Sequence, residues 1–106
     1  MDYRTLKVDT LTDLVSAFCR DYDRRAAAVK QNKGSKRVLT ELRFINYKVL
    51  EAAREIAGVD AEIYIREIGK KKGFASSDIA RLSEVAYKLK KAEIVANIAK
   101  HLYLTD

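Results

Sequence analysis

The chain contains no proline and only four glycines among its 106 residues. A loop-rich or all-β fold needs more turn-forming residues than that, because tight turns depend on the backbone conformations that glycine and proline supply. Hydrophobic residues make up 48% of the chain, which is enough apolar surface to offset the entropy lost on folding. The composition therefore predicts an all-α fold in a single helical domain, residues 1–106.

Apolar residues spaced three and four apart predict two long helices in the N-terminal half. The first runs from about residue 10 to residue 30, and the second spans residues 36–57. In the short turn between them, Gly34 can take a positive φ and Ser35 can cap the second helix. Because the connection is short, residues 10–57 should form an antiparallel helical hairpin.

Three further helices are predicted in residues 60–104, where they should pack with the hairpin as one compact bundle. They cover residues 61–72, 78–82 and 84–102, and Ser83 is the expected cap of the last one. A single continuous helix from residue 78 onward is the alternative. Gly69 inside the first of these helices indicates close packing or an early helix end.

Catalytic and metal-binding chemistry find little support in the sequence. His101 is the only histidine, and its place near the end of the last helix suits the helix dipole or a contact with another helix. Cys19 adjoins an apolar stripe, which predicts a buried, inert thiol. Because it is the only cysteine, an internal disulfide is excluded. There is no glycine-rich phosphate loop and no metal-ligand spacing. We therefore expect a protein that is not an enzyme and has no cofactor or metal.

The net charge of +6 is spread unevenly along the chain. Residues 24–48 carry a net charge of +7 and residues 70–91 a net charge of +5, and the segments around them are mildly acidic. A positive surface attracts polyanions, and nucleic acid is the polyanion for which each neutralised phosphate makes binding salt-dependent. The alternative is a charged surface that only keeps the protein soluble.

The second basic block and the start of the last helix favour a helix-turn-helix, in which the second helix enters the major groove of duplex DNA. If Val85 and Leu89 face the core, Tyr87 and the neighbouring lysines point outward. The predicted DNA-binding residues are Lys70, Lys71, Lys72, Ser83, Glu84, Tyr87, Lys88, Lys90 and Lys91. Around the first turn, Lys33, Lys36 and Arg37 form a second basic site that could contact phosphates.

The C-terminal stretch resembles the final helix of small phage-encoded transcription regulators of the ArpU and RinA type. Their recurrent pattern has a serine cap, a tyrosine four residues later, basic residues directly after it and an apolar tail. Here it matches Ser83, Tyr87, Lys88 with Lys90 and Lys91, and then Ile98, Ala99 and Leu102. The resemblance implies a sigma-factor-like helix-turn-helix and a DNA-binding regulator of phage or prophage genes.

A second class of function stays open, namely a helical protein–protein interaction or dimerisation module that works through the N-terminal hairpin. Exposed aromatic side chains would support it, and the candidates are Phe44, Tyr47, Tyr64 and Tyr103. The expected partners are thus duplex DNA, with a second copy of the chain or RNA polymerase as further candidates. No apolar stretch approaches the roughly 20 residues that span a bilayer. The N-terminus lacks an apolar signal core, so we expect a cytoplasmic location and no membrane partner.

Overall fold

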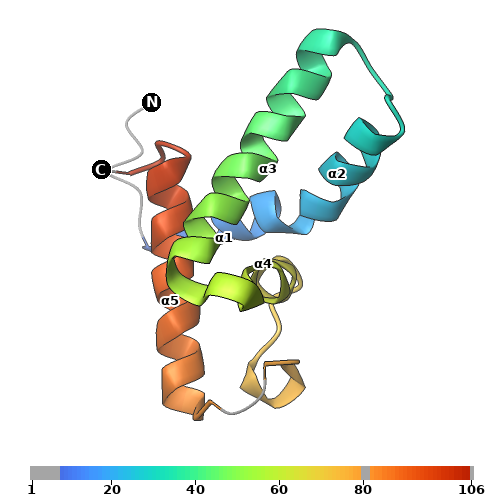
Figure 1. Ribbon diagram of the computed structural model, residues 1–106. Coiled ribbons are helices and arrows are strands. Elements are labelled where there is room, and N and C mark those ends of the chain that lie inside the picture. Colours follow the sequence, from blue (N-terminus) through green and yellow to red (C-terminus); the bar gives the residue numbers. More distant parts are fainter. Residues whose placement is uncertain (1–7, 80–81, 106) are drawn as a thin grey trace.

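Five α-helices and two short 3-10 turns form the regular structure of residues 8–79 and 82–105, the part of the chain that the computed structural model describes (Figure 1). The α-helices are α1 Val8–Arg20, α2 Tyr22–Lys30, α3 Lys36–Ala57, α4 Ala61–Gly69 and α5 Glu84–His101, and the 3-10 turns are Gly58–Asp60 and Phe74–Ser76. There is no strand in these residues. The predicted all-α fold is confirmed.

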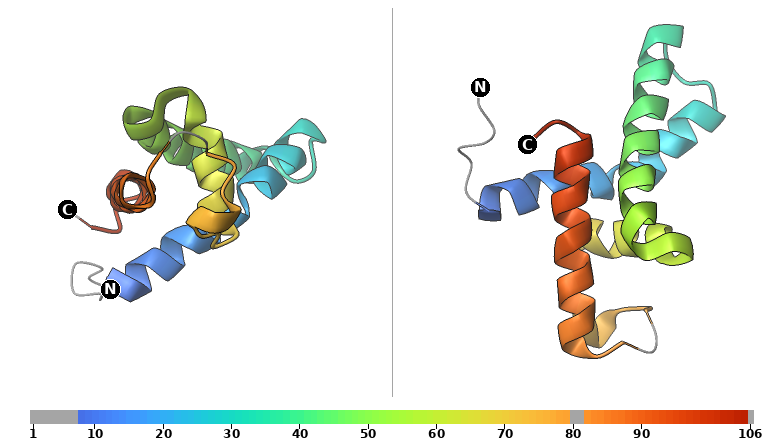
Figure 2. Two further views of the ribbon diagram at one scale, coloured as in Figure 1. Left: turned by 90° about the horizontal axis from the view of Figure 1, so that it is seen from below. Right: turned by 60° about the vertical axis from the view of Figure 1, so that its left-hand side comes forward.

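One hydrophobic cluster includes residues from all five α-helices. α5 lies against α3, and α4 packs against both α1 and α3 (Figure 2). Each of these helices contributes at least one fully buried aliphatic side chain: Val15, Val49, Ile65 and Ile98 are 0% exposed. Burying a side chain of this kind contributes about 1.5–3 kcal/mol relative to leaving it in water. The hairpin and the C-terminal helices therefore share one core.

The predicted bounds of α3, residues 36–57, and its predicted cap at Ser35 are confirmed. The Ser35 side chain accepts a hydrogen bond from the backbone N–H of Val38 at 3.2 Å, which satisfies one of the free donors of the first turn. At the other end, Gly58 takes a φ of +54° as the residue after the helix. Gly34 in the preceding turn also has a positive φ, as predicted.

The single helix predicted for residues 10–30 is wrong, because the structure divides it at Asp21 into α1 and α2. The buried guanidinium of Arg25 donates to the backbone carbonyl of Phe18 at 2.5 Å and to Oδ1 of Asn46 at 2.6 Å. The Asn46 amide in turn donates to the carbonyl of Tyr22. These bonds satisfy backbone groups next to the break, so α1 can pack against α4 while α2 pairs with α3.

The short helix predicted for residues 78–82 is also wrong in the residues that the structure describes, and residues 80 and 81 lie outside them. The Ser77 hydroxyl and the Asp78 N–H both donate to the carboxylate of Glu67, at 2.6 and 2.7 Å. These hydrogen bonds hold Ser77 against α4, so it does not cap a helix. α4 ends at Gly69, so residues 70–83 separate α4 from α5. The turn of three or four residues that a helix-turn-helix requires is absent here.

α5 begins where it was predicted to begin, with the Ser83 side chain accepting from the N–H of Ala86 at 3.1 Å. The face that it buries differs from the prediction in its first half. Val85 is 77% and Leu89 59% exposed, whereas Tyr87 is 1% exposed. In the second half, the predicted burial of Ile98 and Ala99 is confirmed.

Candidate nucleic-acid interface

Tyr87 belongs to the core and cannot reach a nucleic acid. Its ring stacks on Tyr64 and packs against Phe74, with centroid distances of 5.9 and 5.8 Å. Its hydroxyl donates to Oε1 of Glu67 at 2.8 Å. Burial, followed by this hydrogen bond, raises the pKa of Tyr87 to about 12. Tyr87 therefore stabilises the packing of α5 on α4.

Most of the lysines predicted to bind DNA through the C-terminal half already have partners. Lys91 donates to the backbone carbonyl of Lys72, its Nζ lies 5.4 Å from the centroid of the Tyr87 ring, and burial lowers its pKa. Three other lysines form ion pairs: Lys71 with Asp13 at 3.1 Å, Lys72 with Asp78 at 3.6 Å, and Lys88 with Glu84 at 2.9 Å. Within the described residues, only Lys70 and Lys90 of this predicted set of lysines have no ion pair or hydrogen bond.

The two basic blocks lie at opposite ends of the molecule. α5 begins at the lower end of Figure 1, whereas α3 begins at the upper end, and the second view in Figure 2 agrees. Lys33, Lys36 and Arg37 are all exposed there, at the tip of the α2–α3 hairpin. The structure therefore does not bring them together with Lys88 and Lys91.

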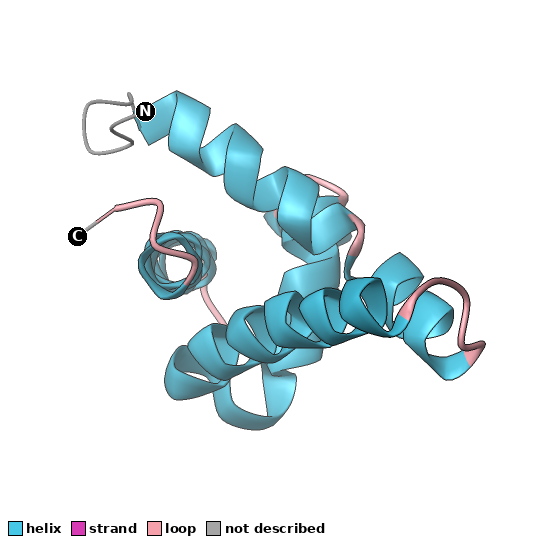
Figure 3. Cartoon of the chain, turned by 90° about the horizontal axis from the view of Figure 1, so that it is seen from above, coloured by secondary structure: helices cyan, strands magenta, loops and turns pink. Residues whose placement is uncertain are grey.

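The α2–α3 hairpin concentrates the cations that remain free. Residues 22–48, which comprise α2, the turn and the first half of α3, form what we call the basic arm. It projects from the rest of the molecule, with its turn at the far edge from α5 (Figure 3). Four of its cations are exposed and have no ion pair among the described residues: Lys30, Lys33, Lys36 and Arg43. Only Glu41 adds a negative charge between residues 24 and 48, and it pairs with Arg37 at 3.5 Å.

Two aromatic rings stand among these cations on the outer side of α3. Phe44 is 53% and Tyr47 61% exposed, and Nζ of Lys48 lies 5.5 Å from the centroid of Phe44. Tyr47 also borders a groove of about 340 Å³ between α2 and α3. The site residues predicted from the sequence did not include Lys30, Arg43 or Lys48. The charge of residues 24–48, the largest along the chain, was the signal that could have found them.

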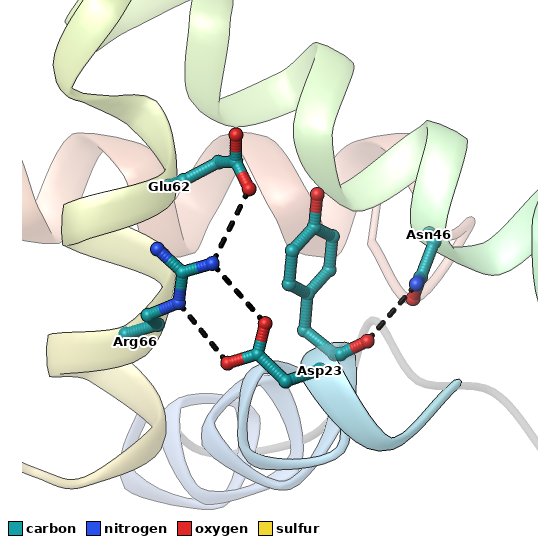
Figure 4. A network of polar contacts seen from close by, with 5 residues as sticks. Asp23, Asn46, Glu62 and Arg66 are labelled. Atoms are coloured by element: carbon teal, nitrogen blue, oxygen red, sulfur yellow. Dashed lines mark hydrogen bonds and ion pairs between the residues drawn. The ribbon is translucent and has the colours of Figure 1, made fainter. Parts of the chain in front are cut away.

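The base of the arm is fixed to the body of the protein. Arg66 on α4 donates to both carboxylate oxygens of Asp23, at 3.0 and 3.2 Å, and reaches Glu62 at 3.4 Å (Figure 4). The hydrogen bonds with Asp23 raise the pKa of Arg66. Together with the hydrogen bond from Arg25 to the Phe18 carbonyl of α1, this arrangement holds the base of the arm against the body.

The remaining candidates for chemistry have structural partners. Cys19 is 2% exposed, and burial raises the pKa of its thiol to about 12, so it is the inert thiol predicted from the sequence. His101 reaches Glu55 on α3 through Nε2 at 2.5 Å, which makes it the helix-contact residue of the two alternatives. Among the residues that the structure describes, no cluster of three or more His, Cys, Asp or Glu side chains could hold a metal.

No protein-family model matches the chain, and no curated protein or solved structure is similar to it. None of the helices in residues 8–79 and 82–105 combines the length and the hydropathy needed to cross a membrane. The site therefore has to be interpreted from its own residues.

Proposed function

We propose that the protein binds nucleic acid without catalysing a reaction, and that it does so with the basic arm. The observation that carries the proposal is the set of four exposed, unpaired cations on one projecting hairpin, Lys30, Lys33, Lys36 and Arg43. Lysine and arginine on such a surface neutralise phosphates and release counterions, which provides most of the free energy of sequence-independent binding. On α5 the carboxylate of Glu84 lies 2.9 Å from Nζ of Lys88 and offsets its charge, so this helix presents less net positive charge to a polyanion.

This proposal moves the interface away from α5. The buried Tyr87, the paired Lys88 and the absence of a short turn before α5 all argue against a major-groove helix there. A role in regulating phage or prophage genes, and a contact with RNA polymerase, stay predictions that depend on the resemblance of residues 83–104. The basic arm is compatible with both, since an arm that holds DNA leaves α5 free for another partner.

Reversing charge on the arm should weaken binding much more than the same reversal on α5. For the wild type and a labelled oligonucleotide, we expect the logarithm of the binding constant to fall against the logarithm of the salt concentration with a slope of about −3. Each of four neutralised phosphates contributes ~0.7–0.9 to this slope. In Lys33→Glu with Lys36→Glu, the slope should shrink by about 2, because each lost phosphate contact removes about 1. Fluorescence anisotropy at several salt concentrations measures both the affinity and the slope.

The matched control is Lys70→Glu with Lys90→Glu, which changes the net charge equally and removes the two unpaired lysines of the C-terminal block. Circular dichroism checks that both variants are folded. The assignment to the arm is wrong if the control pair weakens binding as much as the arm pair. The whole proposal fails if the wild-type protein does not bind at low salt.

Self-association is the second candidate, and one specific observation favours it. Val85 and Leu89 form an exposed apolar stripe on α5, next to a groove of about 440 Å³ between α1 and α5. Of the aromatic side chains proposed above for a dimer contact, Phe44 and Tyr47 are also exposed on the arm, whereas Tyr64 is buried. Apolar surface of this kind marks contacts with other proteins.

If α5 mediates self-association, light scattering at rising concentration should show a dimer. In that case Leu89→Lys should restore the monomer, because a charge would be buried in the contact. Val59→Lys is the control, since Val59 is fully exposed and lies outside the stripe. A strict monomer at every concentration contradicts the second candidate and leaves the first untouched.

A further inference from the structure

Phe44 and Tyr47 are the two exposed aromatic residues of the basic arm, and unlike Tyr22 they are not part of the buried core. Positions 44 and 47 are three residues apart and therefore neighbours on the helix surface, with about 5–6 Å between their Cβ atoms. More than half of each side chain is exposed, although both stand among charged residues. Phe44 contacts the ammonium of Lys48 and Tyr47 borders the groove between α2 and α3. Large apolar surface that is left open in a charged patch indicates a ligand with both apolar and anionic groups.

We propose that the nucleic acid held by the basic arm is a single strand, with successive bases stacked on Phe44 and Tyr47 and its phosphates on the surrounding cations. This inference rests on the proposed function and specifies its substrate. A single strand offers the flat faces of its bases to aromatic side chains, and stacking combined with a positive surface is how such strands are bound without sequence preference. In a duplex these faces are covered by the neighbouring base pairs, so the two rings would gain nothing.

The groove beside Tyr47 has the composition that an unstacked base needs. Ala26, Val29 and Leu50 provide an apolar lining, and Lys30 and Arg43 border the same groove. A base that lies against Tyr47 would bury its face on this lining while the adjoining phosphates meet the two cations. Stacking on an aromatic ring and charge neutralisation thus act at one place.

Beside the two rings on α3, the polar side chains of Thr40 and Asn46 are already engaged, whereas Gln31 and Asn32 are exposed at the turn of the arm. The Thr40 hydroxyl donates to the carbonyl of Lys36 at 2.9 Å, and the Asn46 amide donates to the carbonyl of Tyr22. Sequence readout of a duplex depends on such groups reaching base edges in the major groove. Next to the rings, neither Thr40 nor Asn46 has its donor available for a ribose 2′-hydroxyl, so we expect single-stranded DNA and RNA to bind there with similar affinity.

The test compares Phe44→Ala, Tyr47→Ala and Tyr47→Phe with the control Tyr103→Ala, whose ring is exposed but lies outside the arm. The probes are oligo-dT, oligo-U and a DNA duplex of the same length. Each alanine variant should bind oligo-dT about five- to hundredfold more weakly, with an unchanged salt slope because the cations remain. Tyr47→Phe and Tyr103→Ala should retain wild-type affinity, and the duplex should bind more weakly than oligo-dT to the wild type.

Two results with the DNA probes would overturn the inference and leave the proposed function standing. One is a duplex affinity that equals or exceeds that of oligo-dT, and the other is an alanine variant that binds like wild type while charge reversal on the arm abolishes binding. Strict dependence on oligo-U would also overturn it, because recognition would then depend on the 2′-hydroxyl. Failure of every probe to bind the wild type would remove both proposals together.

Discussion

Replacing Glu67 by alanine should lower the free energy of unfolding by about 3–5 kcal/mol, because the substitution removes the common acceptor of a buried polar network. Glu67 is 2% exposed and accepts hydrogen bonds from the Tyr87 hydroxyl, the Ser77 hydroxyl and the Asp78 N–H. Without the carboxylate, the Tyr87 hydroxyl, the Ser77 hydroxyl and the Asp78 N–H all lose their common acceptor. A loss of this size is a large share of the roughly 5–15 kcal/mol that stabilises a domain.

Urea unfolding followed by circular dichroism measures the effect through the midpoint and the slope of the transition. Glu62→Gln is the matched control, since Glu62 is an exposed carboxylate on the same helix whose ion pair with Arg66 should contribute about 0–1 kcal/mol. Glu67→Gln keeps an acceptor oxygen and should fall between the two. A Glu67→Ala variant as stable as the control would show that the loop of residues 70–83 does not depend on this carboxylate.

The same carboxylate predicts how stability changes in acid. Burial raises the pKa of Glu67, but the hydrogen bonds from Ser77, Asp78 and Tyr87, together with the charge of Lys72, lower it more, so the pKa lies below its ordinary value of 4.5. A depressed carboxylate pKa contributes stability that is fully present above the unfolded pKa and is lost as the pH falls through the folded pKa. Stability should therefore fall below pH 4.5 in the wild type, and less steeply in Glu67→Gln.

The elements that the sequence predicted well are those whose signals are local. Ser35 and Gly58 act on residues next to them, so both ends of α3 could be placed from the chain alone. The break at Asp21 could not, because Arg25 is held by Asn46, which is 21 residues away and on another helix. No glycine or proline marks the break, and the apolar spacing continues across it.

The choice of the buried face of α5 explains why the candidate site lies on the basic arm and not on α5, where it was predicted. Val85, Leu89 and Ala92 follow the same three-four spacing as Tyr87, Lys91 and Ile94, so the pattern admits two faces, and hydropathy alone favours the first. The contact that selects the second is the buried Glu67, 20 residues before Tyr87. Lys33, Lys36 and Arg37 were placed correctly at an exposed turn, whereas the position of the arm on the body depends on the contact of Arg66 with Asp23, 43 residues away.

Gly69→Ala should be the second most disruptive change, because α4 and α1 touch through their backbones at this point. A Cβ at residue 69 would lie 2.7 Å from the backbone nitrogen of Arg20, 2.8 Å from its Cα and 2.9 Å from the carbonyl carbon of Cys19. No side-chain rotation can relieve contacts with backbone atoms, so the two helices would have to move apart. Overpacking of this kind costs about 1–3 kcal/mol or more, which outweighs the helix propensity of about 1 kcal/mol that alanine adds.

Thermal unfolding followed by circular dichroism makes the comparison, with Gly73→Ala as the matched control. A Cβ at Gly73 meets no atom within 4 Å, and the φ of −93° there is open to alanine. We expect Gly73→Ala to change Tm by a few degrees at most, whereas Gly69→Ala should lower it by about 4–20 °C, since 1 kcal/mol corresponds to ~4–8 °C in a domain of this size. A rise in Tm for Gly69→Ala would mean that the backbones of α1 and α4 lie farther apart at Gly69 than these distances require. In that case Cys19, next to the contact, should also react with thiol reagents in the folded protein.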